Sequence, residues 1–284
     1  TLNMKASNER IPNSYVIPDN VKTREFINQL PFKLTHAQLR TWEEVKNNMS
    51  GKHLTSRLIQ GDVGSGKTIV AVLALMNTAF AGYQGAMMVP TEVLARQQYE
   101  SIRNMFANAG IDINVGLLTG SMTQSARRKV YDDIKNGTID IVVGTHALIQ
   151  EKVEYNNLAL VITDEQHRFG VNQRKQLSDK GNNPHIIVMS ATPIPRTLAL
   201  ILYGDLDISI IDELPPNRKT IETFAVTNRM EERINNFIKK QIDDGRQAYI
   251  VCPLVEESEE EDTDLKAVTT LYEKCKEETF PDYR

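Results

Sequence analysis

The sequence predicts an α/β fold in which a parallel β-sheet is flanked by helices. Two observations lead to this prediction. From about Phe32, short runs of apolar and β-branched residues alternate with helical patterns, and a glycine-rich turn joins one such run to an apolar helix. Parallel strands need long crossover connections, which helices usually supply. The predicted strands are Arg57–Gln60, Gly85–Val89, Asp112–Leu118, Asp140–Gly144, Ala159–Thr163 and His185–Ser190.

The alternation stops near Tyr203 and begins again after two adjacent prolines, Pro215 and Pro216. We therefore expect four segments: a connecting segment over 1–30, a complete lobe over 31–211, a linker over 212–219 and the start of a second lobe over 220–284. In this second lobe, strands over Thr220–Val226 and Gln247–Pro253 are expected to flank a helix. Two strands are too few to bury a complete sheet.

Composition limits the class of protein. Of 284 residues, 40% are hydrophobic and 25% are charged, which is typical of a soluble globular chain. The longest strongly apolar stretch, Ile69–Met76, is too short to span a bilayer, so we expect a cytoplasmic protein with no membrane partner. Cys252 and Cys275 form no disulfide framework. The net charge of −4 does not indicate a nucleic-acid partner, although an acidic chain can carry a local basic track.

The strongest chemical signal is the segment Gly61–Thr68, which matches the phosphate-loop pattern G-x-x-x-x-G-K-[ST] between an apolar strand and an apolar helix. Glycines allow backbone N–H groups to turn around phosphate oxygens, and the helix N-terminus adds positive potential. Lys67 is expected to reach the β- and γ-phosphates, and the Thr68 hydroxyl to hold Mg²⁺. The predicted nucleotide-binding residues of this loop are Gly61, Asp62, Val63, Gly64, Ser65, Gly66, Lys67 and Thr68.

A second signal is the pair of carboxylates Asp164 and Glu165, which directly follows an apolar strand. Ligands of open α/β sheets bind at the carboxyl ends of the strands. Asp164 is expected to hold Mg²⁺ through water, and Glu165 to polarise an attacking water. A strand-terminal Asp-Glu alone is usually a solvated turn, but downstream of a phosphate loop it is the expected partner in phosphoryl transfer.

The segment from Phe32 to Gln38 precedes the loop by some twenty residues. The amide of Gln38 can pair with the N6 amino group and N7 of adenine, which would select ATP over GTP. In the alternative interpretation, Thr35 caps a helix and Gln38 is the third residue of a capping box. Local physics favours the capping box.

Seven motifs in order resemble those of superfamily-two helicases: Leu34–Gln38, Gly61–Thr68, Pro90–Gln97, Thr119–Ser121, Gly144–His146, Asp164–His167 and Ser190–Thr192. The stretches Asp164–Val171, Ser190–Ala199 and Leu30–Thr35 more narrowly resemble the RecG family of ATP-dependent branched-DNA helicases. The family of transcription-repair coupling translocases shares parts of these stretches, but Gln166 favours RecG. The resemblance extends from about Phe32 to Glu261.

This resemblance implies a RecA-like lobe that binds ATP and Mg²⁺ and the start of a second one. Phe32 and Gln38 would join the phosphate loop in binding the nucleotide, and the catalytic residues would be Lys67, Asp164, Glu165 and His167. The metal would be held by Thr68 and Asp164. Segments containing Thr91, Gly120 and Thr145 would contact branched or single-stranded DNA. Coupling between the nucleotide and the DNA would involve Ser190, Ala191 and Thr192.

The resemblance also implies parts that are not recognised in this sequence, namely a DNA-binding wedge domain and the rest of the second lobe with its catalytic arginines. We therefore expect the chain to be a helicase fragment from recombination and repair that binds ATP, hydrolyses it slowly and does not unwind DNA. Two other classes stay open. One is a P-loop ATPase unrelated to nucleic acid, and the other is a nonenzymatic docking module. The acidic run over 256–262 is expected to be a solvated loop.

Overall fold

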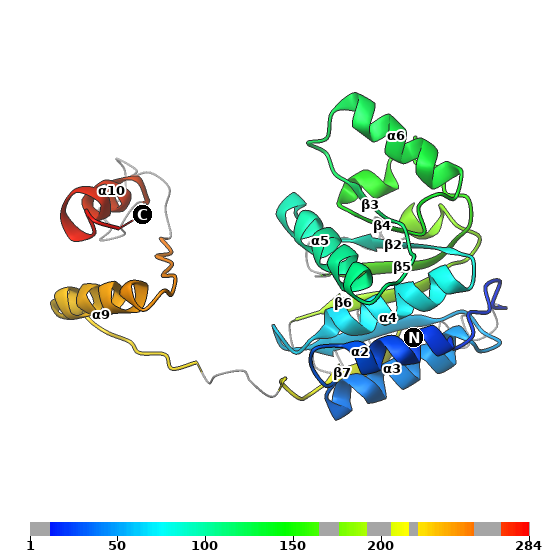
Figure 1. Ribbon diagram of the computed structural model, residues 1–284, viewed down its shortest axis with the longest axis horizontal. Helices are drawn as coiled ribbons and strands as arrows, with labels where there is room; N and C mark the ends of the chain where they lie inside the picture. Colours follow the sequence, from blue (N-terminus) through cyan, green and yellow to red (C-terminus); the bar gives the residue numbers. More distant parts are fainter. Residues whose placement is uncertain (1–11, 165–175, 192–205, 216–220, 253–267, 284) are drawn as a thin grey trace. The chain divides into compact units, whose positions relative to one another are not determined.

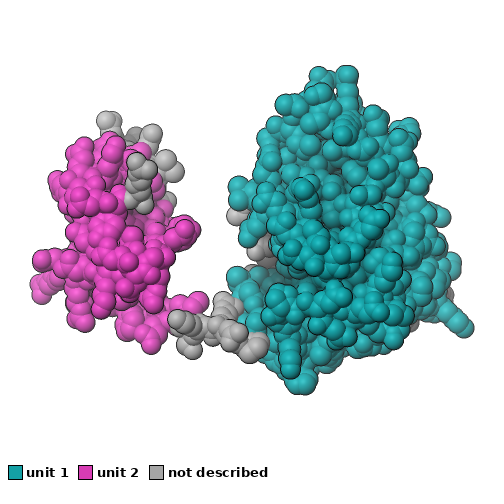
Figure 2. Space-filling model, in the orientation of Figure 1, with its two compact units in different colours: residues 1–218 teal, residues 219–284 magenta. Residues whose placement is uncertain are grey.

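The computed structural model describes residues 12–164, 176–191, 206–215, 221–252 and 268–283 of the chain. The chain separates into two compact units, residues 1–218 and 219–284, which are coloured teal and magenta in Figure 2.

The described part of unit 1 is built on one parallel sheet of seven strands in the order β3-β4-β2-β5-β6-β1-β7 (Figure 1). This arrangement confirms the predicted fold class. All six predicted strands form, with shifts at their ends. A seventh strand, β7, was not predicted; it pairs in parallel with β1 at the edge of the sheet. The strands are β1 (Ser56–Gly61), β2 (Gln84–Met88), β3 (Val115–Leu118), β4 (Ile141–Gly144), β5 (Leu158–Asp164), β6 (His185–Ser190) and β7 (Asp207–Ile211).

Helices lie on both faces of this sheet because alternate strand residues point to opposite sides and both sides are apolar. Met87 and Val89 belong to the larger core cluster, whereas Ala86 and Met88 belong to the second one. The larger cluster is covered by α2 (Val21–Gln29), α3 (His36–Met49), α4 (Lys67–Phe80) and α5 (Glu92–Asn108). The second is covered in part by α6 (Gln124–Lys135) and the 3₁₀ helix η1 (His146–Ile149).

Helix α4 is the central helix of unit 1. Ten of its residues are buried, most of them alanine, valine or leucine. It approaches strand β2 closely where Gly85 lies, since a Cβ at that position would meet Leu75 Cδ2 at 2.5 Å. The N-terminus of the same helix lies at the carboxyl end of β1, where the phosphate loop is.

Residues 12–29, expected from the sequence to belong to a connecting segment, pack against the rest of unit 1. Tyr15, Ile17 and Phe26 are buried, and the rings of Phe26 and Phe106 meet edge to face with centroids 6.1 Å apart. The imidazole of His185 lies between this segment and the sheet. It accepts a hydrogen bond from Thr55 N at Nδ1 and donates one from Nε2 to Tyr15 O.

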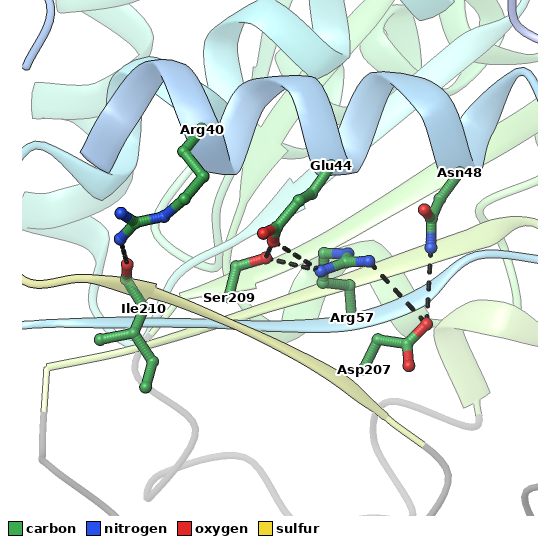
Figure 3. Close-up of polar contacts among 7 residues, drawn as sticks. All are labelled: Arg40, Glu44, Asn48, Arg57, Asp207, Ser209 and Ile210. Atoms are coloured by element: carbon green, nitrogen blue, oxygen red, sulfur yellow. Dashed lines mark hydrogen bonds and ion pairs between the residues drawn. The ribbon is translucent and has the colours of Figure 1, made fainter. Parts of the chain in front are cut away.

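Polar contacts fasten helix α3 to the edge of the sheet (Figure 3). Arg57, which is 7% exposed, donates through Nη1 to Glu44 Oε2 at 3.0 Å and to Ser209 Oγ at 2.6 Å. Its Nη2 lies 3.8 Å from Asp207 Oδ2. Closer to the start of the helix, Arg40 donates to Ile210 O at 3.0 Å. Arg57 of β1 therefore links its own strand to both β7 and helix α3.

Unit 2 contains short η3 (Asn228–Met230), helix α9 (Glu231–Asp243), helix α10 (Val268–Lys274) and a π-helical turn, η4 (Cys275–Thr279). The predicted helix is confirmed as α9, but none of its described side chains is buried. The two predicted strands are wrong over the residues described, 221–226 and 247–252, which form no strand. A strand needs a partner for its backbone groups, and apolar composition alone does not provide one. Within the described residues, none of the helices has the length and apolar character needed to cross a bilayer.

Candidate nucleotide and nucleic-acid site

The phosphate loop joins the carboxyl end of β1 to the N-terminus of α4. Gly64 and Gly66 have φ angles of 76° and 82°, in the left-handed region that favours glycine. Ser65 N donates to Asp62 O at 3.1 Å, which tightens the turn. The Ser65 hydroxyl is buried and has no hydrogen-bond partner among the described residues. The loop leads directly into the N-terminus of α4. The first backbone amides of a helix have no partner within the helix, so such an end readily binds an anion.

Lys67 is the first residue of α4, and its ammonium group folds back over the loop. Nζ donates to Gly61 O at 2.8 Å and to Asp62 O at 3.0 Å. Both acceptors are neutral backbone carbonyls of the loop itself. The left-handed glycines, this lysine and the hydroxyl of Thr68, which follows it, are the groups with which a phosphate loop binds a nucleoside triphosphate, so the loop fits such a ligand.

Gln38 is 2% exposed and connects helix α3 to the phosphate loop. Its Oε1 accepts from Thr35 N at 2.9 Å and its backbone N donates to the Thr35 hydroxyl, which confirms the capping box. Nε2 donates to Ser65 O at 2.8 Å. A Cβ on Gly66 would come within 2.2 Å of this nitrogen. The sequence did not predict the contact with Ser65; Phe32, at the start of the segment, is half exposed.

The predicted metal and coupling residues lie at the carboxyl ends of neighbouring strands. In the register of the sheet, Asp164 of β5 is opposite Met189, and Ser190 of β6 is opposite Gln60. Asp164 is thus two strands away from the phosphate loop, and Ala191 directly follows β6. The described residues contain no group of three His, Cys, Asp or Glu side chains that could hold a metal. Glu165, His167 and Thr192 lie outside the described residues.

The predicted DNA-contacting residues lie after β2, β3 and β4. Thr91 caps helix α5, with its hydroxyl accepting from Leu94 N at 3.3 Å. Gly120 is exposed, whereas Thr145 is buried and its hydroxyl has no partner among the described residues. Thr91 and Gly120 belong to loops that are tied together, because Glu92 Oε1 accepts from Ser121 N at 2.9 Å. The hydrogen bonds from Ser121 lower the pKa of Glu92.

The chain that leaves β7 also contacts helix α3, which the sequence did not predict. Glu213 Oε2 accepts from Ala37 N at 3.1 Å, at the positive end of the helix. Arg40 Nη2 lies 2.8 Å from Asp212 Oδ1, and this hydrogen bond lowers the pKa of Asp212. Helix α3 therefore contacts both the phosphate loop and the segment that leaves unit 1. The two contacting residues of each pair are more than 170 positions apart in sequence, so no local pattern could have revealed them.

Comparisons with known proteins agree with this geometry. Residues 35–201 match the family described as DEAD/DEAH box helicase. The chain is 52% identical over 243 residues to the ATP-dependent DNA helicase RecG of Bacillus subtilis, and 52% identical over 261 residues to that of Aquifex aeolicus. These alignments cover 86% and 91% of this chain, and 35% and 32% of the two relatives.

A solved structure of RecG bound to a three-way DNA junction is 42% identical, with a TM-score of 0.76 over 96% of this chain and 35% of that one. The chain thus spans about a third of the length of the relatives that it matches. The resemblance to RecG that the motifs indicated is confirmed. With the family match covering more than half of its residues, the chain belongs to the DEAD/DEAH box helicase family.

Proposed function

We propose that this chain is the ATP-binding part of an ATP-dependent DNA helicase that acts on branched DNA, such as replication forks and Holliday junctions, in recombination and repair. The observation that carries the proposal is the phosphate loop, in which two left-handed glycines and Lys67 meet the N-terminus of α4. The likeness to RecG proteins, and to a RecG structure whose title names a three-way DNA junction, supports the choice of DNA.

In the proposed mechanism, Lys67 exchanges the carbonyls of Gly61 and Asp62 for phosphate oxygens, which compensate its charge. Amides at the start of α4 bind the same phosphates. Bound Mg²⁺ would neutralise charge that develops on the phosphates, and Thr68 and Asp164 would hold it. Glu165 would orient the attacking water, and His167 with Ser190, Ala191 and Thr192 would transmit the nucleotide state to the DNA site.

Gln38 keeps one amide hydrogen and one lone pair beyond the contacts described above, and we propose that these read adenine. Because Gln38 also contacts Ser65 O, nucleotide recognition and loop conformation would be linked through one side chain. Thr91, Gly120 and Thr145 would contact the DNA backbone without reading bases. We further propose that the 284-residue chain alone turns ATP over slowly, since no catalytic arginine motif of a second lobe is recognised in it.

The test is a titration of the chain with a fluorescent ATP analogue and Mg²⁺, repeated with the Lys67→Ala variant. We expect Lys67→Ala to weaken binding at least tenfold, whereas Lys52→Ala, which removes an exposed lysine elsewhere on unit 1, should leave it unchanged. Equal affinities of the two variants would overturn the nucleotide site.

The DNA part of the proposal is tested separately. Fork-shaped DNA with a fluorescent label should bind to the chain in an anisotropy titration. A chain that binds ATP but ignores DNA at low salt would instead be a P-loop ATPase unrelated to nucleic acid.

A further inference from the structure

A cavity of about 440 Å³ opens in unit 1 between the first two turns of α6 and the segment that follows η1. Both walls come after the carboxyl ends of strands, α6 after β3 and η1 after β4, which are neighbours at one side of the sheet (Figure 1). Three cations, Arg127, Arg128 and Lys152, line it together with Gln124, Tyr131 and Gln150. The lining includes a single carboxylate, that of Glu151.

Hydrogen bonds hold the two walls of this cavity in place. The Tyr131 hydroxyl lies 3.3 Å from Gln150 Oε1 and bridges from one wall to the other. Behind the second wall, Lys180 Nζ donates to the backbone oxygens of Gln150 at 2.8 Å, of Glu151 at 3.3 Å and of Val153 at 3.1 Å. One hydrogen bond therefore joins the two walls, and three more hold the second wall to Lys180.

The charge on this surface is opposite to that of the chain as a whole. Three cations and one carboxylate leave an excess of positive charge in a chain whose net charge is −4. Arg128 and Lys152 are exposed, and neither forms an ion pair within the part of the chain that the structure describes. An excess of cations over carboxylates attracts an anion, and the tyrosine and glutamine side chains offer further hydrogen bonds to its oxygens.

One residue of the cavity also contacts a loop already expected to bind DNA. Arg127 Nη2 donates to Gly120 O at 2.6 Å and to Met122 O at 3.1 Å. One guanidinium thus lines the cavity and fixes the Gly120 loop, whose Ser121 amide is joined to Glu92. The loop expected to contact DNA and the cavity are therefore linked by the guanidinium of Arg127.

We infer that this cavity is a further binding site for the phosphodiester backbone of DNA, held by Arg128 and Lys152. The inference rests on the proposed function, since it extends the path of the DNA beyond the recognised motifs. Cations, amides and a hydroxyl contact phosphates and sugars without reading bases, so the site strengthens binding at any sequence.

The experiment compares DNA binding by the unchanged chain, by Arg128→Ala/Lys152→Ala and by a matched control, Arg103→Ala/Lys129→Ala. The control removes two exposed cations of α5 and α6 that do not line the cavity, so both variants have the same net charge. Affinity for labelled duplex and fork DNA is measured by anisotropy across a series of salt concentrations. Thermal unfolding shows whether each variant remains folded.

We expect the cavity variant to bind DNA about tenfold or more weakly. The slope of log affinity against log salt should become shallower by about 1.8 on duplex DNA, which corresponds to the loss of roughly two phosphate contacts. The control should keep the original slope. Equal slopes for the two variants would overturn the inference while leaving the proposed function intact. Failure of the unchanged chain to bind DNA would overturn both.

A free polyphosphate is the other source of the same chemistry. If it occupied the cavity, Lys67→Ala would keep weak ATP binding that disappears when Arg128 and Lys152 are also replaced. That result, with unchanged DNA affinity, would overturn the DNA assignment.

Discussion

At the amino ends of strands β1 and β6, the buried side chains of Arg57 and His185 meet partners from distant parts of unit 1, although Arg57 Nε and the nearby Thr55 hydroxyl have none among the described residues. Arg57 meets Glu44, Ser209 and Asp207, and both ring nitrogens of His185 are hydrogen-bonded. Within the described part of the chain, buried hydroxyls without a partner are more numerous at the carboxyl ends. There the hydroxyls of Ser65, Thr119, Thr145 and Thr163 are buried without a partner among the described residues.

This contrast separates two uses of buried polar groups. A matched group holds elements together, because removing one partner leaves the other desolvated and unsatisfied. An unmatched group lowers stability unless a ligand or water satisfies it, and such groups collect where function demands them. The amino ends of the strands are therefore expected to govern stability, and the carboxyl ends to govern ligand binding. Three substitutions test this difference.

The largest effect is expected for Gly66→Ala at the carboxyl end. The left-handed φ of this residue costs a side chain about 1–2 kcal/mol, and the new Cβ would also displace Gln38 Nε2 from Ser65 O. We expect a loss of roughly 3 kcal/mol in the free energy of unfolding and at least a tenfold loss of ATP affinity. Urea unfolding and nucleotide titration measure the two quantities.

Gly82→Ala is the matched control, because Gly82 has nearly the same φ, 81°, but open space where its Cβ would be. It should lose only about 1 kcal/mol and keep its ATP affinity. Gln38→Ala completes a double-mutant cycle with Gly66→Ala. It should lower the free energy of unfolding by about 1–2 kcal/mol in the native sequence, but by almost nothing more in a chain that already carries Gly66→Ala. Fully additive effects would show that Gly66 and Gln38 are not coupled.

A smaller effect is expected for Arg57→Met at the amino end. Removing a buried guanidinium leaves Glu44, Ser209 and Asp207 without their shared donor, at a cost of about 2 kcal/mol, less than for a fully buried pair because both carboxylates are partly exposed. Lys135→Met removes a mostly exposed pair with Glu154 and should change stability by no more than about 0.5 kcal/mol. ATP affinity should not change in either variant. A marked loss of ATP affinity in Arg57→Met would contradict the expectation that the amino ends of the strands govern stability and not ligand binding.

The smallest effect concerns the pH dependence of His185. Burial lowers the pKa of this imidazole, so the unfolded chain, with a pKa near 6.5, binds a proton before the folded chain does. The stability that neutral His185 contributes is present above about pH 6.5 and is lost as the pH falls toward the folded pKa. Between pH 7.5 and 5.5, we expect the native chain to lose up to about 1 kcal/mol more than the His185→Gln variant in urea unfolding. Parallel curves for the two proteins would contradict this role.

Much of unit 1 follows from local sequence patterns. The phosphate loop was predicted because its chemistry depends on residues that are neighbours in sequence: glycines for the turn, then Lys67 and Thr68 at the start of a helix. The six strands were predicted because apolar runs between helices can be buried on both faces of a parallel sheet. Helix α9 was likewise predicted from its own periodicity. In each case the residues that form the pattern are the same sequence neighbours that form the structural element.

The two wrong strand predictions depend instead on contacts between segments that are not neighbours in sequence. Residues 221–226 and 247–252 are apolar enough for strands, yet a strand exists only when another strand satisfies its amides and carbonyls. The alternating run Asp207–Ile211 did become a strand because β1 lies beside it. Strands were predicted in the first two places and not in the third, so the presence of a neighbouring strand decided the outcome and the apolar run did not.

The sequence alone therefore determined the fold class, the family resemblance and the position of the phosphate loop, since these depend on short-range periodicity and spacing. Tertiary structure decided which polar groups meet. Gln38 reaches Ser65 from 27 residues away, and Glu213 reaches Ala37 from 176 residues away. The cavity beside Gly120 likewise joins two segments that only the sheet brings together. Hydrogen bonds and charge interactions act over a few ångströms in space, and one-dimensional order does not record which residues will come that close.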